Sequence, residues 1–224
     1  MTNLVDFEDT GRLWLRGLLA KNELEDFAGS FHLGGKPGLR LKLTNSLKPF
    51  LGRRSNLAKE LAALGVSSTP VRLVSFDKSD EANWGVPWHQ DRVIAVKKTS
   101  EVKGYRNWVR KTDFWHCEPP INLLSEMLFV RIHIDPCNAS NGAMEIAIGS
   151  HKHGLIKSCD ASSLAISCPI ETCEAEAGDV LILKALTLHR SGVATNQNRR
   201  RTLRVDYAKR NCLHPRLEWA IASD

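Results

Sequence analysis

Two stretches near the beginning of the chain repeat apolar residues at helical spacing. Residues 22–32 start at Asn22, a residue type that caps helices, and Glu25 stands where a capping box places its carboxylate. Residues 55–64 start at Ser55 and repeat leucine every three or four residues, and Gly65 follows as a stop signal. The pattern therefore predicts a helical N-terminal region over about residues 1–66.

From Val71 the pattern changes to short apolar or alternating runs separated by turn residues. The runs are VRLVSFDK, RVIAV, MLFVRIHID, AMEIAI, PIETCEAEA, DVLILKA, LHRSGVA and TLRVDYA. Several short strands at such spacing are typical of an antiparallel barrel or jelly roll. We therefore predict a single mainly β domain over residues 1–224 with flanking helices, its barrel covering about residues 70–210.

Residues 97–125 fit neither the helical nor the strand pattern. The segment contains two tryptophans, a tyrosine and a proline pair. Long inserts at a barrel mouth often form lids or binding loops. An ordered insertion is expected here.

Composition narrows the class of protein. Of 224 residues, 42% are hydrophobic and 25% charged, as in ordinary globular domains. The six cysteines form no CxxC pair. No apolar run approaches the ~20 residues that a membrane helix needs. The first residues do not resemble a signal or transit peptide. We expect a cytoplasmic protein with free thiols. Its net charge of +6 favours anionic small-molecule partners.

Candidate chemistry begins at Pro87-Trp88-His89-Gln90-Asp91. On an extended segment, side chains two residues apart point the same way, so His89 and Asp91 could offer an imidazole and a carboxylate to one point. Such a pair is weak by itself, because surface hydrogen bonds produce the same pattern.

His189 follows the apolar run DVLILK and could complete a set of two histidines and one carboxylate. A histidine in an apolar strand is more often a hydrogen-bonded core residue than a ligand. However, this trio of ligands occupies one face of a six-coordinate metal and is typical of non-heme Fe(II) oxygenases.

Arg200 lies eleven residues after His189. A hairpin centred between Ala194 and Thr195 would place the two side by side, within reach of an anion bound at the metal. A guanidinium holds a carboxylate through two parallel hydrogen bonds, and Ser191 would face the same side. Arg199 and Arg201 would then point to solvent.

Together, WHQD, NGAMEIAIGSHKHG, AGDVLILKALTLHRSG and RRTLRVDYA resemble the phytanoyl-CoA dioxygenase family over roughly residues 70–208. The resemblance implies a double-stranded β-helix, a cupin-like jelly roll that uses Fe(II), 2-oxoglutarate and O₂. It also implies that His89, Asp91 and His189 bind the iron, and that Arg200 grips the distal carboxylate of 2-oxoglutarate with help from Ser191.

The same resemblance implies oxidation of a C–H bond with release of succinate and CO₂. Related halogenases replace the carboxylate ligand with a small residue, so Asp91 predicts hydroxylation instead. The substrate is expected to be a small organic molecule, acidic or acyl in character.

Two features depart from the family. Arg131 stands where many members have a tryptophan, and it is a candidate contact to 2-oxoglutarate or to an anionic substrate. The 97–125 segment is longer than in the phytanoyl-CoA enzyme, which argues against that substrate.

Four other residues are candidate substrate contacts: Gln90, Trp108, His116 and His133. His133 belongs to a second HxD, His133-Ile134-Asp135, but lacks the family's surrounding residues. It is therefore expected inside the barrel near the site and not on the metal.

Three alternatives remain open. A barrel without turnover could bind a metal or ligand through the same pocket. A nucleic-acid demethylase would suit the basic run 199–201, although the charges are scattered and interspersed with acidic residues. A hydrolytic zinc or manganese site would leave Arg200 and Ser191 without a task.

Overall fold

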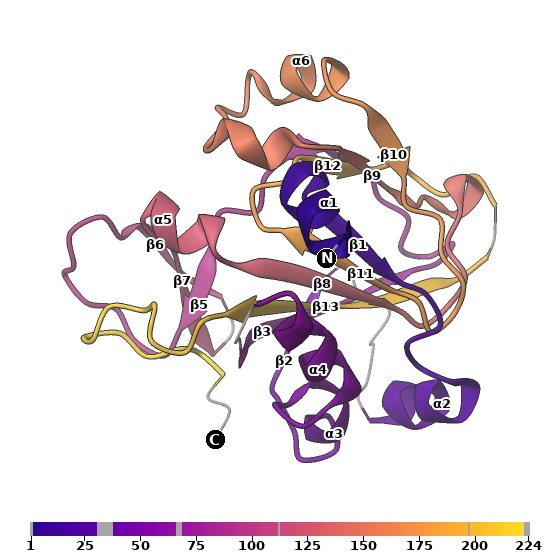
Figure 1. Ribbon diagram of the computed structural model, residues 1–224, viewed down its shortest axis with the longest axis horizontal. Helices are drawn as coiled ribbons and strands as arrows, with labels where there is room; N and C mark the ends of the chain where they lie inside the picture. The colour runs from indigo at the N-terminus through magenta and orange to yellow at the C-terminus, as the bar shows by residue number, and fades with distance from the viewer. Residues whose placement is uncertain (1, 31–37, 66–68, 112, 197, 222–224) are drawn as a thin grey trace.

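The computed structural model describes residues 2–30, 38–65, 69–111, 113–196 and 198–221. Its largest sheet has six antiparallel strands in the order β1-β11-β8-β13-β3-β2. These strands are β1 (Arg12–Leu15), β11 (Val180–Lys184), β8 (Leu128–His133), β13 (Arg200–Ala208), β3 (Thr69–Lys78) and β2 (Leu39–Leu41). A four-stranded sheet, β10-β9-β12-β4, forms a second layer (Figure 1). Its strands are β10 (Ile170–Thr172), β9 (Met144–Ala147), β12 (His189–Ser191) and β4 (Val86–His89).

The two layers form the predicted jelly roll, and side chains of both line one cavity. The six-stranded sheet has an outer face, covered by helices, and an inner face, turned toward the four-stranded sheet. Strand β8 illustrates how one strand serves both faces. Val130 and Ile132 join the core under the helices, whereas Phe129 and Arg131 lie on the inner side. Period-two alternation thus sends every second residue toward the cavity.

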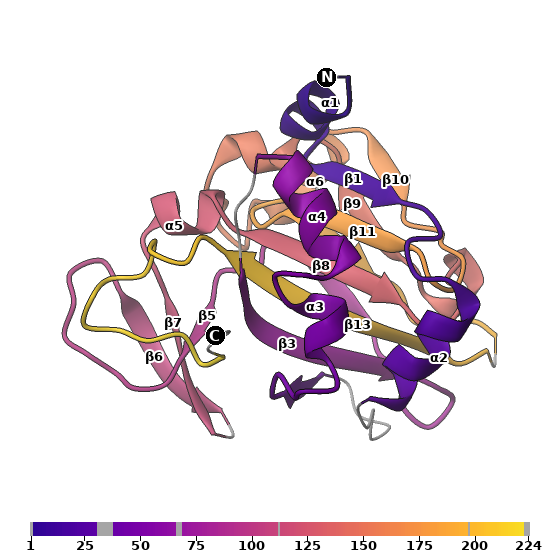
Figure 2. The ribbon, with the colours of Figure 1, turned by 60° about the horizontal axis from the view of Figure 1, so that its bottom comes forward.

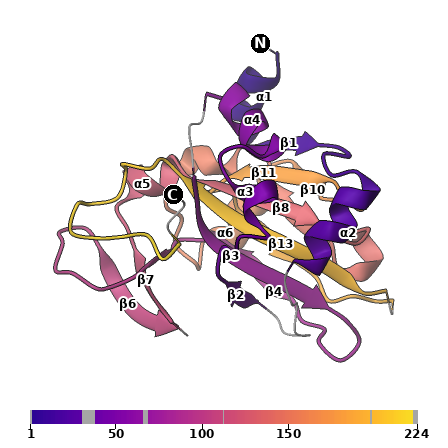
Figure 3. The same ribbon diagram turned by 90° about the horizontal axis from the view of Figure 1, so that it is seen from below.

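Three helices cover the outer face: α2 (Lys21–Gly29), α3 (Lys48–Leu51) and α4 (Asn56–Ala63) (Figure 3). Helix α4 begins as predicted, with the Ser55 hydroxyl accepting from the Ala58 N–H at 3.0 Å. Helix α2 begins before Asn22. Its N-cap is Ala20, whose N–H donates to the Glu23 carboxylate at 3.0 Å. The prediction that Asn22 caps this helix was therefore wrong. His32 lies outside the described residues.

The N-terminal region is not purely helical. Helix α1 (Thr2–Thr10) is followed by β1, which pairs with β11, and β2 pairs with β3. These two strands form the opposite edges of the six-stranded sheet. They are only four and three residues long, too short for their periodicity to be distinguished from the helices around them.

The described part of the 97–125 segment contains two strands and one short helix. Strands β6 (Arg106–Lys111) and β7 (Phe114–Glu118) form a small sheet with β5 (Ile94–Val96), at one side of the jelly roll (Figure 2). Helix α5 (Ile121–Ser125) follows, and Val96 bridges to Trp219 near the C-terminus.

The predicted hairpin between His189 and Arg200 is absent, because β12 and β13 belong to different sheets. His189 pairs with His89 and Ile146, and Arg200 pairs with Lys78. The chain crosses from one layer of the jelly roll to the other between these strands. The two residues therefore approach one cavity from different sheets and not as neighbours in a ladder.

All six cysteines are free thiols, in agreement with the sequence-based expectation. Among the described residues, no helix is long and apolar enough to cross a membrane.

Ser150, in the short 3₁₀ turn Ser150–His153, supports the strand that carries His189. Its hydroxyl donates to the Ala147 carbonyl at 2.6 Å and accepts from the Leu188 N–H at 2.9 Å. The side chain is fully buried. Ser150, which lies in the NGAMEIAIGSHKHG stretch of the family resemblance, therefore has a structural role.

We predict that Ser150→Ala lowers the free energy of unfolding by about 1–3 kcal/mol, because it leaves a buried N–H and carbonyl without partners. Urea denaturation followed by circular dichroism measures the change. Ser163→Ala is the matched control, since Ser163 is exposed on helix α6 (Ala161–Ile166). Equal stability of the two variants would contradict the supporting role.

Candidate metal centre

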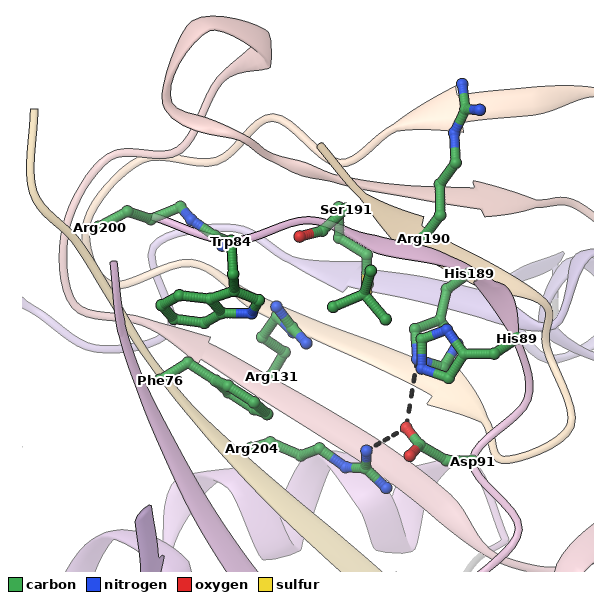
Figure 4. A pocket seen from close by; sticks show the side chains of 12 residues that line it. Phe76, Trp84, His89, Asp91, Arg131, His189, Arg190, Ser191, Arg200 and Arg204 are labelled. Carbon is green, nitrogen blue, oxygen red and sulfur yellow. Dashed lines mark hydrogen bonds and ion pairs between the residues drawn. The ribbon is translucent and has the colours of Figure 1, made fainter. Parts of the chain in front are cut away.

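His89, Asp91 and His189 converge as predicted. One potential ligand atom from each lies within 4.8 Å of the others, the only such group of three among the described residues. His89 and His189 are direct partners between β4 and β12, and their ring centroids are 4.3 Å apart. Nε2 of His189 lies 3.2 Å from Oδ2 of Asp91 (Figure 4). The two strands place the imidazoles, and the loop after β4 brings the carboxylate to them.

Both imidazoles are oriented by backbone carbonyls. Nδ1 of His89 lies 2.8 Å from the Pro87 carbonyl, and Nδ1 of His189 lies 3.0 Å from the Thr187 carbonyl. A carbonyl only accepts, so each Nδ1 donates and each Nε2 keeps a free lone pair. Metal-binding histidines have this arrangement, which fixes the tautomer and the ring orientation.

The electrostatics keep His89 and Asp91 in the forms that bind a metal. Burial, followed by the neighbouring His189, lowers the pKa of His89 and favours its neutral form. Burial alone would raise the pKa of Asp91, but Arg204, His189 and Arg72 outweigh it and hold that pKa well below its ordinary value. A neutral imidazole and an ionised carboxylate are the forms that a divalent metal requires.

Arg204 lines the same cavity as the triad and was missed by sequence reasoning. It forms an ion pair with Asp91, and its Nε lies 2.7 Å from Oδ1 of Asp206. Its guanidinium carbon stands 3.8 Å from the centre of the Phe129 ring. The signal was present in TLRVDYA, where Arg204 and Asp206 alternate with apolar residues and must therefore share one face of a buried strand.

Beyond the triad, the cavity contains two guanidinium groups without an anionic partner. It measures about 160 Å³, and both Arg131 and Arg200 line it. Among the described residues, neither arginine forms an ion pair with a carboxylate. Arg200 is 3% exposed, and its Nε has no hydrogen-bond partner among the described residues. Its Nη1 lies 3.9 Å from the Cys137 sulfur.

Buried cations of this kind are unfavourable unless something neutralises them. Burial, followed by the nearby Arg200 and Arg204, lowers the pKa of Arg131 to about 10. In Figure 4, Arg131 lies between the triad and Arg200. The cavity is therefore suited to a small molecule with negative charge, part of it near the metal ligands and part near Arg200.

Ser191 lines the same cavity, as predicted. Lys78, which sequence reasoning did not select, fastens its wall. The Lys78 ammonium donates to the Trp84 carbonyl at 2.7 Å and to the Gly192 carbonyl at 2.6 Å. Burial, then Arg200, lowers its pKa to about 8. Lys78 thereby joins β3 to the segments before β4 and after β12.

The Asn141-Gly142 turn packs against this lysine. Gly142 has a φ of +74°, and a Cβ there would lie 2.7 Å from both the Lys78 Nζ and the Gly192 carbonyl oxygen. Only glycine combines this conformation with so close an approach. The turn is thus structural and carries no chemistry.

Gln90 does not face the cavity. Its amide nitrogen donates to the carbonyls of Gly154 and Leu186 at 2.8 and 2.7 Å, and its amide oxygen accepts from the Ile156 N–H at 2.9 Å. These bonds hold the loop that carries Asp91 against residues 154–156 and against Leu186. The predicted substrate contact is therefore a structural residue.

His133 is directed inward, as its strand pattern predicted, but it packs away from the cavity. Its Nδ1 lies 3.2 Å from the Asp179 carbonyl, and its ring is 5.7 Å from that of Trp14. Burial, followed by Arg131, lowers its pKa to about 3. A neutral histidine packed against a tryptophan is a core residue, so the second HxD forms no site.

The two candidates from the insertion also lie outside the cavity beside the triad. His116 is buried in a separate small cavity with Arg40 and Arg72. Trp108, on strand β6, packs against the buried apolar cluster that contains Val96 and Met127. The small sheet flanks the jelly roll and does not bring these side chains to the metal ligands.

Arg199 and Arg201 are paired with acids and are not a free basic run. Arg199 donates to both oxygens of Asp77 at 2.8 and 2.6 Å, and Arg201 donates to both oxygens of Asp135 at 2.8 and 2.7 Å. Arg199 is exposed, as expected, and Arg201 is half-buried, and each lies beside a carboxylate that neutralises it.

Comparisons with solved structures show the same fold. AviO1 from Streptomyces viridochromogenes Tue57 matches with a TM-score of 0.66 at 19% identity, over 95% of this chain and 96% of its own. The α-ketoglutarate-dependent epimerase SnoN from nogalamycin biosynthesis matches with a TM-score of 0.65 at 13% identity, over 100% of this chain and 92% of its own. HygX from Streptomyces hygroscopicus, with nickel, 2-oxoglutarate and hygromycin B bound, matches with a TM-score of 0.63 at 14% identity, over 94% and 87%.

Among curated protein sequences, no relative matches the chain. The family model for phytanoyl-CoA dioxygenase, by contrast, matches residues 42–202, well over half of the sequence. This range contains the triad, Ser191 and Arg200, which the sequence resemblance assigned to the site, as well as Arg131. The chain belongs to the phytanoyl-CoA dioxygenase (PhyH) family.

Proposed function

We propose that the protein is an Fe(II)- and 2-oxoglutarate-dependent dioxygenase that hydroxylates a C–H bond of a small organic substrate. The observation that carries this proposal is the convergence of a two-histidine, one-carboxylate triad and two unpaired guanidinium groups on one cavity. The triad fits a metal with open coordination positions. The guanidinium groups fit a dicarboxylic acid that reaches from the metal toward Arg200.

In this proposal, His89, Asp91 and His189 hold the iron through the two Nε2 atoms and a carboxylate oxygen. Arg200 binds the distal carboxylate of 2-oxoglutarate and Ser191 adds a hydroxyl, while Arg131 neutralises the carboxylate at the other end. Iron and 2-oxoglutarate together supply the activation of O₂, with release of succinate and CO₂. The chain itself supplies orientation, charge neutralisation and exclusion of water.

Hydroxylation is supported by the chain's own ligand set. The Asp91 carboxylate occupies the position that halogenases leave free for chloride, so a chlorinated product is not expected. Structurally similar enzymes use this fold for other reactions: SnoN is an epimerase and SnoK a carbocyclase, both from nogalamycin biosynthesis. An oxygen atom in the product therefore distinguishes hydroxylation from these reactions.

The substrate is inferred to enter beside the apolar part of the cavity wall. Phe76, Trp84 and Val86 line that part, and Arg190 at the same wall is already paired with Glu145 at 2.7 Å. A small, partly apolar molecule suits such a wall. HygX, another protein of this fold, has the small molecule hygromycin B bound. The nucleic-acid alternative loses its main support, because Arg199 and Arg201 are neutralised within the chain.

The direct test is anaerobic titration of the purified protein with Fe(II) and 2-oxoglutarate. A weak visible absorption band that requires both components is expected, and air should then convert 2-oxoglutarate to succinate slowly without added substrate. Protein that binds iron but shows neither signal would refute the dioxygenase and leave a binding module or a hydrolytic site.

We predict that His89→Ala removes metal-dependent turnover and weakens Co²⁺ binding. Loss of a residue that only hydrogen-bonds to a metal ligand lowers metal affinity by roughly 10- to 100-fold, and loss of the ligand itself should cost more. Isothermal titration calorimetry measures the affinity, and circular dichroism should show an unchanged fold. His153→Ala is the control, since His153 is exposed on a surface turn. If both variants bound Co²⁺ equally well, the ligand assignment would fail.

For Arg200→Met, the apparent KM for 2-oxoglutarate should rise by roughly 10- to 100-fold, because a buried charge-assisted contact to the acid is lost. Co²⁺ affinity without 2-oxoglutarate should stay as in wild type. Succinate formation at varied 2-oxoglutarate gives the KM. Arg201→Gln on the same strand serves as control, and an unchanged KM in Arg200→Met would contradict the anchor.

A further inference from the structure

The loop that carries Asp91 is fastened at three points. On one side, the Gln90 amide holds three backbone groups of neighbouring segments. Asp91 itself is ion-paired with Arg204. On the other side, Arg72 donates from Nη1 to the Val93 carbonyl at 3.3 Å, just before strand β5.

Arg204 and Arg72 are joined by one buried carboxylate. Oδ1 of Asp206 lies 2.7 Å from Nε of Arg204, and Oδ2 lies 2.6 Å from Nε of Arg72. All three side chains are less than a tenth exposed. Together with Asp91 they form an alternating row of two negative and two positive charges, so each buried charge has a partner of opposite sign.

This row begins at the Asp91 carboxylate and returns, through Arg72, to the backbone two residues further along the same loop. Arg204, which stands next to Asp91 in this row, has little conformational freedom. Arg204 is held by Asp206 through Nε and lies against the Phe129 ring, with its guanidinium carbon 3.8 Å from the ring centre. The arrangement needs a planar group that contacts two carboxylates and stacks on an aromatic ring, which lysine cannot reproduce.

We propose that Arg204 is a positioning residue of the metal centre, held in place by Asp206 and Arg72. It fixes the Asp91 side chain so that Oδ2 stands beside Nε2 of His189, where the ligands converge. Without Arg204 the carboxylate is free to rotate away from the two imidazoles. The inference rests on the proposed metal site, and it assigns to Arg204, Asp206 and Arg72 a role that the metal ligands alone do not reveal.

The sign of the effect separates positioning from simple electrostatics. A positive charge near a cation site weakens metal binding by repulsion, so removing a guanidinium that acted through its charge alone would strengthen binding. Removing a positioning residue has the opposite result, because the remaining ligand loses its orientation. The direction of the change in metal affinity therefore decides between the two.

The experiment measures Co²⁺ affinity and the visible Co²⁺ absorption spectrum without 2-oxoglutarate, for wild type, Arg204→Met, Arg204→Lys and Asp206→Asn. We expect Arg204→Met to bind Co²⁺ on the order of 10- to 100-fold more weakly and with an altered spectrum. Arg204→Lys should recover little of this loss, and Asp206→Asn should weaken binding in the same direction by a smaller factor. Arg201→Gln, which breaks an ion pair on the same strand, should match wild type.

Wild-type or tighter Co²⁺ binding by Arg204→Met would overturn the positioning role, and so would an equal loss in Arg201→Gln. If Arg204→Met does not fold, Arg204→Lys and Asp206→Asn decide: wild-type affinity and spectrum in both would overturn it. Failure of the wild-type protein to bind Co²⁺ would instead refute the metal site and the proposed function.

Discussion

The need to neutralise buried positive charge governs the interior of this protein. The inner face of the six-stranded sheet carries Arg72, Arg131, Arg200 and Arg204, and a buried guanidinium is unfavourable without an anion. Arg204 and Arg72 are neutralised inside the chain by Asp91 and Asp206. Arg131 and Arg200 have no carboxylate among the described residues, so their neutralisation falls to a ligand. In the proposed function, this division separates the part of the face that orients the metal ligands from the part that binds an acid.

The jelly roll makes this division possible because it brings together two sheets that carry different side chains into one cavity. The four-stranded sheet supplies His89 and His189 as direct partners, with both rings fixed by backbone carbonyls. The six-stranded sheet supplies the charged residues opposite them. Asp91 comes from a loop and has no strand to orient it, which explains why it needs partners on the facing sheet. Buried polar networks of this kind are stable only when nearly every member is satisfied.

The metal ligands were predictable because their signal is local. Residues two apart on an extended segment share a face, so His89 and Asp91 could be paired from sequence, and His189 follows a recognisable apolar strand. The strands β8, β11 and β13 were equally clear, since each is five residues or longer and is either mostly apolar or contains alternating apolar and polar residues. The short edge strands β1 and β2 were missed. They exist because the sheet offers them a pairing partner, and nothing in a three- or four-residue run reveals that partner.

The sequence alone determined the types of the three converging residues and the jelly-roll pattern, because alternation and spacing carry that information. Arg200 was assigned to the pocket by the family resemblance, since the hairpin that its spacing suggested does not form. Only the tertiary structure decided how these parts meet. The predicted hairpin put Arg200 beside His189, whereas the chain crosses between sheets and Arg200 arrives from the opposite layer. Gln90, His116 and His133 had residue types suited to a site, yet their surroundings make them core residues. Arg204 shows the reverse case: its partner Asp91 is 113 residues away in sequence, and only folding across two sheets brings that carboxylate within its reach.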